Sequence, residues 1–151
     1  MLEKLGPQWK ELALNHIQEG TTNDMEYQEM MNLFNRNYLY RLPEWTESMK
    51  YTVAHMNPEI SETLFGTNDF IINGILKSYD RFQEIKTIKV PLLMTCGQYD
   101  WARPDTLAQS IEGMSNGKLF ILEKSAHMAH IEEKELYLEK IKEFLKEECK
   151  L

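Results

Sequence analysis

The chain has 151 residues and a formal net charge of −7, and 42% of its residues are hydrophobic. This length and apolar content allow a folded core and exclude an intrinsically disordered chain. Acidic and basic residues are mixed along the sequence without a basic block, so the composition argues against a nucleic-acid-binding protein.

The sequence also lacks the marks of a membrane-bound or secreted protein. No run approaches the roughly 20 apolar residues that cross a bilayer, and the first residues, MLEKLGP, do not form a signal-peptide core. The two cysteines, Cys96 and Cys149, have the spacing of neither a disulfide framework nor a metal site. We therefore expect a soluble, cytoplasmic protein with reduced thiols and no metal or cofactor.

Residues 1–85 are predicted to be helical, because apolar residues recur at the three- and four-residue spacing of an amphipathic helix. A first helix should begin near Pro7 and end at Gly20. A second should follow the capping candidate Asp24, and a third should begin at Pro43. These residues are expected to form one helical region.

Residues 86–151 have a different pattern. Residues 90–96 and 118–122 are short apolar runs of the kind found in buried parallel strands. Residues 104–114 should form the helix between the two strands, and residues 134–146 a closing helix. The predicted architecture is α/β: a helical region followed by a βαβα unit with two parallel strands.

Two ionisable residues follow the two predicted strands. Asp100 comes after the first strand and His127 after the second. The carboxyl ends of parallel strands meet at one edge of a sheet, where ligands usually bind in such folds. A carboxylate there can orient an imidazole. An Asp that orients a His in this way forms the general-base half of a catalytic triad. Asp100 has the alternative of being an ordinary turn residue.

Other candidates have simpler interpretations. The pattern G-x-S-x-G occurs at residues 113–117, but Ser115 would lie between a helix and a following strand, the reverse of the order that exposes a nucleophile. His130 is expected to be a surface or supporting histidine, and His16 and His55 to lie on helical faces. The glutamates at positions 132, 133, 135, 139, 143, 147 and 148 are predicted to form a solvated helix face.

Several motifs resemble one known family. LMTCGQYD at residues 93–100, followed by Pro104, resembles the acid turn of serine α/β-hydrolases, and SAHMAHIEE at residues 125–133 resembles the segment that carries their catalytic histidine. FGTNDF at residues 65–70 resembles the junction between cap and core in prolyl iminopeptidases. The resemblance implies a partial α/β-hydrolase fold, in which residues 1–85 form the helical cap, or lid, and residues 86–151 the C-terminal part of the core.

The resemblance also implies a function. In this family the nucleophilic Ser precedes the cap, followed by the Asp and the His. The chain should therefore supply Asp100 and His127 to an enzyme that releases N-terminal proline or a similar residue from peptides, and should be inactive alone. Its partners would be a small peptide substrate and the missing N-terminal half in trans, or a second copy of the chain.

Substrate contacts follow from the same resemblance. Prolyl iminopeptidases hold the substrate's free amine with acidic side chains at the cap junction and directly after the catalytic Asp. Asp69 stands at the first position, but Trp101 stands at the second. Two alternatives therefore remain: an esterase or amidase of the same fold, and a truncated, non-catalytic remnant or interaction module.

Overall fold

The computed structural model describes residues 4–68 and 70–149. The chain divides into two compact units. The first comprises Met1–Phe34 and Leu42–Asp80, and the second comprises Asn35–Arg41 and Arg81–Leu151. The end of the second helix and the residues after it therefore belong with the strands.

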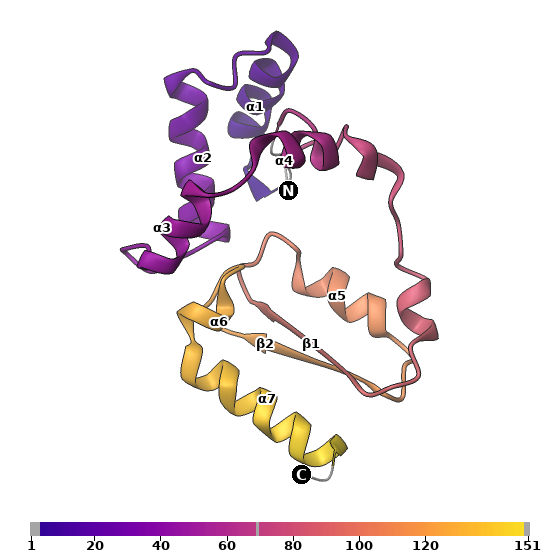
Figure 1. The fold of residues 1–151 in the computed structure, drawn as a ribbon. Helices are drawn as coiled ribbons and strands as arrows, with labels where there is room; N and C mark the ends of the chain where they lie inside the picture. Colours follow the sequence, from indigo (N-terminus) through magenta and orange to yellow (C-terminus); the bar gives the residue numbers. More distant parts are fainter. Residues whose placement is uncertain (1–3, 69, 150–151) are drawn as a thin grey trace. The chain divides into compact units, whose positions relative to one another are not determined.

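Helices make up the first unit (Figure 1). They are α1 (Pro7–Glu19), most of α2 (Met25–Tyr38), α3 (Glu47–Ala54), α4 (Pro58–Phe65) and the 3₁₀ helix η2 (Ile75–Ser78). Gly20 ends α1 as predicted, in the left-handed conformation (φ 71°) that favours glycine. Buried aromatic rings form part of the core: the centroids of Phe34 and Phe70 lie 5.2 Å apart, edge to face.

The third helix begins later than the sequence predicted. It starts at Glu47 rather than Pro43, because the hydroxyl of Thr46 accepts a hydrogen bond from the backbone N–H of Met49 and caps the first turn. Asn57 caps α4 in the same way through Ile60. The capping side chain of Thr46, and not Pro43, therefore sets the start of α3.

The second unit contains two parallel strands, β1 (Leu92–Gly97) and β2 (Gly117–Leu122), paired along their whole length. Helix α5 (Pro104–Ile111) connects them. The short helix η3 (Glu84–Thr87) precedes β1, and the short helix α6 (Ala129–Glu132) precedes α7 (Lys134–Cys149). Figure 1 shows α5 and α7 on opposite sides of the strands. This arrangement confirms the predicted βαβα unit.

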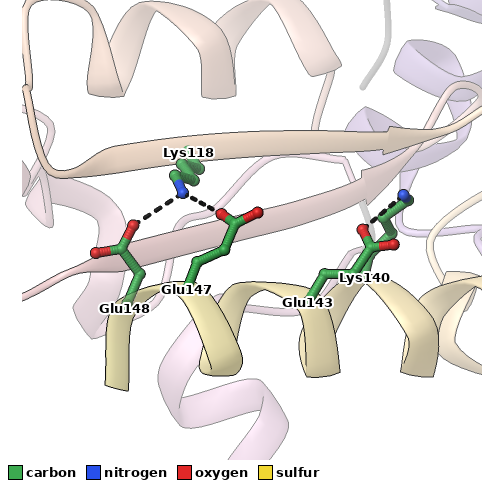
Figure 2. Close-up of polar contacts among 5 residues, drawn as sticks. All are labelled: Lys118, Lys140, Glu143, Glu147 and Glu148. Carbon is green, nitrogen blue, oxygen red and sulfur yellow. Dashed lines mark hydrogen bonds and ion pairs between the residues drawn. The ribbon is translucent and has the colours of Figure 1, made fainter. Parts of the chain in front are cut away.

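Helix α7 is joined to β2 by charged side chains. The Nζ of Lys118 lies 2.7 Å from a carboxylate oxygen of Glu147 and 2.8 Å from one of Glu148 (Figure 2). The hydrogen bonds to these two carboxylates raise the pKa of Lys118 to about 12. Within α7 itself, Lys140 and Glu143 form an ion pair at 2.7 Å.

Two element ends differ slightly from the predicted ones. The first strand begins at Leu92, and Val90 is 67% exposed. Helix α5 ends at Ile111 instead of residue 114, since the chain turns at Gly113 with a φ of 81°. Among the residues described, no helix combines the length and the apolar character that a membrane span requires.

Candidate functional site

The carboxyl end of β1 lies directly against the histidine loop, residues 123–128. A Cβ on Gly97 would lie 2.2 Å from the carbonyl oxygens of Ser125 and Ala126, so no side chain fits at this position. Just beyond it, the backbone N–H of Tyr99 donates to the carbonyl oxygen of Ser125 at 3.0 Å. The close approach brings the turn after β1 beside the loop after β2.

Asp100 and His127 meet at this edge of the sheet. The Nδ1 of His127 lies 3.0 Å from Oδ1 of Asp100, whose side chain is 6% exposed. The same oxygen accepts the backbone N–H of Ala102 at 2.7 Å. An ionised carboxylate only accepts hydrogen bonds, so in the neutral imidazole the proton belongs on Nδ1, and Nε2 keeps its lone pair. This arrangement gives His127 the tautomer of a general base.

Trp101 covers one side of the imidazole. Its ring centroid lies 4.4 Å from that of His127, with the two planes tilted by 32°. The His127 side chain is nevertheless 37% exposed. The pair is therefore flanked by an apolar surface and remains accessible to a reacting group.

Two glutamates hold the histidine loop by accepting hydrogen bonds from it. Glu133 accepts the hydroxyl of Ser125 at 2.6 Å and the backbone N–H of Lys124 at 3.0 Å. Glu132 accepts the backbone N–H of Ala126. The sequence prediction that these two residues belong to a solvated face is wrong, because both carboxylates turn back to the loop. Their position five and six residues after His127 was the only available signal.

The remaining candidates lie apart from the pair. The exposed ring of His130 lies 6.0 Å from that of Tyr137 and forms no part of the hydrogen bond to Asp100. Ser115 precedes β2, so about 16 Å of strand, five residues at about 3.3 Å each, separates its end of the sheet from that of His127. Asp69 lies outside the described residues.

The described residues also contain no group of three or more His, Cys, Asp or Glu side chains that could hold a metal ion. A shallow pocket of about 260 Å³ lies at the other end of the strands, lined in part by Lys86, Lys89 and Ser115. The pocket is therefore separate from the Asp100–His127 pair.

No protein-family model matches the chain. It is 35% identical over 137 residues to a proline iminopeptidase of Heyndrickxia coagulans, a match that covers 88% of this chain and 47% of that protein. It is 33% identical over 146 residues to a proline iminopeptidase of Saccharolobus solfataricus, covering 96% of this chain and 47% of the relative. The chain thus spans about half the length of the curated relatives it matches.

Solved structures agree with this result. The crystal structure of VinJ superposes with a TM-score of 0.86 at 26% identity, over 97% of this chain and 50% of VinJ. The proline iminopeptidase of Mycobacterium smegmatis gives a TM-score of 0.85 at 21% identity, again over 97% of this chain and 50% of the neighbour. At this identity the match shows a shared fold. The predicted resemblance and fold class are therefore confirmed: this chain has a partial α/β-hydrolase fold, is homologous to about half of each proline iminopeptidase, and is consistent with their C-terminal half.

Proposed function

We propose that the chain is the C-terminal portion of a serine hydrolase that releases an N-terminal proline or a similar residue from peptides. The observation that carries this proposal is the hydrogen bond between Asp100 and His127 at the carboxyl ends of two paired parallel strands. Within the described part of the second unit, no serine forms a hydrogen bond with His127. The nucleophile would come from the part of the relatives that this chain does not span.

Each residue of the pair has a proposed role in acyl transfer. Nε2 of His127 would take the proton of the attacking serine hydroxyl and then give it to the leaving amine. Asp100 would hold the proton on Nδ1 and stabilise the imidazolium that forms, because its carboxylate is almost fully buried beside that nitrogen. Without the serine and its oxyanion hole, the chain by itself should not turn over substrate.

Substrate choice rests on the residues around the pair. Asp69 is proposed to bind the free amine of the substrate, as the resemblance implies, and Trp101 to line the pocket. The position of the Trp101 ring, 4.4 Å from the imidazole, puts an apolar surface where a second carboxylate would otherwise contact an ammonium group. This observation favours, as a second candidate, an esterase or amidase with an apolar pocket.

The proposed partner is the other half of the fold. Among the described residues, β1 pairs only with β2, and a two-stranded sheet is marginal in water with an open edge. The open edge of β1 would pair with a further strand from that half, and a second copy of this chain is the alternative occupant. Light scattering of the purified chain at micromolar concentration tests the second copy, which would give a dimer or larger oligomer. A stable monomer of 17.9 kDa that melts cooperatively would mean that the chain closes its own core, and would contradict this assembly argument. We also propose a cytoplasmic location, where a free thiol such as that of the buried Cys96 stays reduced.

The experiment adds the missing half in trans. The half of the Heyndrickxia coagulans relative that this chain does not match, here called the complementary half, is mixed with the chain. Proline 4-nitroanilide, its N-acylated form and a simple ester are then compared. The proposal expects turnover of the free-amine substrate, and Asp69→Ala should lower it far more than turnover of the acylated one. Turnover of esters alone would favour the second candidate. A folded complex without any turnover would indicate a non-catalytic module.

A further inference from the structure

The residues that follow α2 lie along the histidine loop. The backbone N–H of His127 donates to the carbonyl oxygen of Tyr38 at 3.2 Å, and that of Met128 donates to Leu39 at 3.1 Å. Tyr40 is 2% exposed, and burial followed by the nearby Glu132 carboxylate raises the pKa of its phenol. Residues 38–41, here called the clasp, thus accept hydrogen bonds from the backbone of His127 and of the residue after it.

Glu132 connects the clasp to the loop a second time. One oxygen of its carboxylate accepts the backbone N–H of Arg41, and the other accepts the backbone N–H of Ala126, a fully buried residue next to His127. The guanidinium of Arg41 also lies 3.8 Å from the ring centroid of Tyr99, the neighbour of Asp100. The clasp therefore contacts both turns that carry the Asp100–His127 pair.

A carboxylate suits this position for a physical reason. Each of its two oxygens accepts one N–H, and hydrogen bonds to an ionised acceptor are about twice as strong as neutral ones. An amide of the same shape offers only one oxygen, and its NH₂ group would face a backbone N–H that is itself a donor. Replacing Glu132 with Gln should thus release either Arg41 or Ala126 while it preserves volume.

We propose that Glu132 is a positioning residue, which holds the clasp against the histidine loop and so keeps Nδ1 of His127 at the Asp100 carboxylate. The geometric part of this inference does not depend on catalysis. Its catalytic consequence rests on the function proposed above.

The direct test reads the tautomer of His127 by ¹⁵N NMR of the imidazole at alkaline pH, in the 151-residue chain. In the wild type the neutral ring should carry its proton on Nδ1, where Asp100 accepts it. In Glu132→Gln the ring should shift towards the mixture seen for a free imidazole. The matched control is Glu135→Gln, an exposed position on α7, which should keep the wild-type tautomer. An unchanged tautomer in folded Glu132→Gln would overturn the proposal.

A second measurement uses only the wild-type chain, so it can be made even if Glu132→Gln does not fold. In the wild type, the amide protons of Arg41 and Ala126 should exchange slowly with solvent and at similar rates, since one carboxylate accepts both. Fast exchange of either amide in the folded chain would contradict the clasp. Charge-assisted bonding should also move both amide protons downfield.

Activity with the complementary half separates this inference from the proposed function. If the wild-type complex is active, Glu132→Gln should lower kcat about 10–100-fold with little change in KM, because it displaces the base and not the substrate. Unchanged kcat would contradict the positioning role. If the wild-type complex is inactive, the proposed function fails, while the tautomer and exchange measurements still decide the inference.

Discussion

The carbonyl oxygen of Ser125 occupies the space that a side chain on Gly97 would need, at 2.2 Å from the position of its Cβ. Gly97→Ala should therefore push the histidine loop away from β1 and destabilise the chain by about 1–3 kcal/mol, the usual range for overpacking. The matched control is Gly117→Ala at the other end of the strands, where the nearest atoms lie at 3.3 Å and would have to move by only a few tenths of an ångström. Denaturant unfolding measures both; equal losses would show that the close approach has no special cost.

Trp101 should determine the surroundings of the His127 ring. With ring centroids 4.4 Å apart, the indole shields the imidazole protons, so Trp101→Leu should move their NMR signals downfield. Trp101→Leu should also destabilise the chain by about 0.5 kcal/mol. This is the low end of the range for aromatic pairs, because the site is partly exposed. Tyr137→Leu is the crossed control: it should shift the signals of His130, its own ring neighbour, and leave those of His127 in place. The reverse pattern would contradict the described ring contacts.

The structure explains which of these features the sequence could predict. The two strands, α5 and the placement of Asp100 and His127 followed from local signals, namely short apolar runs and the rule that strand ends meet at one edge. The hydrogen bonds from the histidine loop to Glu132 and Glu133 could not be predicted in this way. Two adjacent glutamates close to a helix have the composition of a solvated face. The bond from Arg41 to Glu132 joins residues 91 positions apart, and no periodicity predicts a contact of that range.

The ion pairs of Lys118 predict a specific pH dependence. Its pKa is raised from 10.5 to about 12 by the hydrogen bonds to Glu147 and Glu148. A raised lysine pKa stabilises the folded state below pH 10.5, and this contribution is lost as pH rises through about 12. Lys118→Met should therefore be slightly less stable than wild type at neutral pH and equal to it above that range. A difference independent of pH would mean that packing, not charge, is responsible.

Ser115 should not behave as a nucleophile. It lies before β2, at the end of the sheet opposite His127, so the His127 imidazole cannot take its proton. A fluorophosphonate probe should leave the isolated chain unlabelled, as judged by mass spectrometry of the intact protein. Labelling that Ser115→Ala abolishes would contradict the assignment of this G-x-S-x-G pattern to an ordinary loop.

The most direct test compares His127 with His130, three residues further along the chain, in the complex with the complementary half. His127 bonds Asp100, whereas His130 contacts Tyr137 and has no carboxylate partner among the described contacts. Hydrolysis of proline 4-nitroanilide should fall by about 10⁴-fold or more in His127→Ala, the scale seen when a triad base is removed, and remain close to wild type in His130→Ala. Equal rates for the two variants, or greater loss in His130→Ala, would contradict the assignment of His127 as the base that this chain supplies.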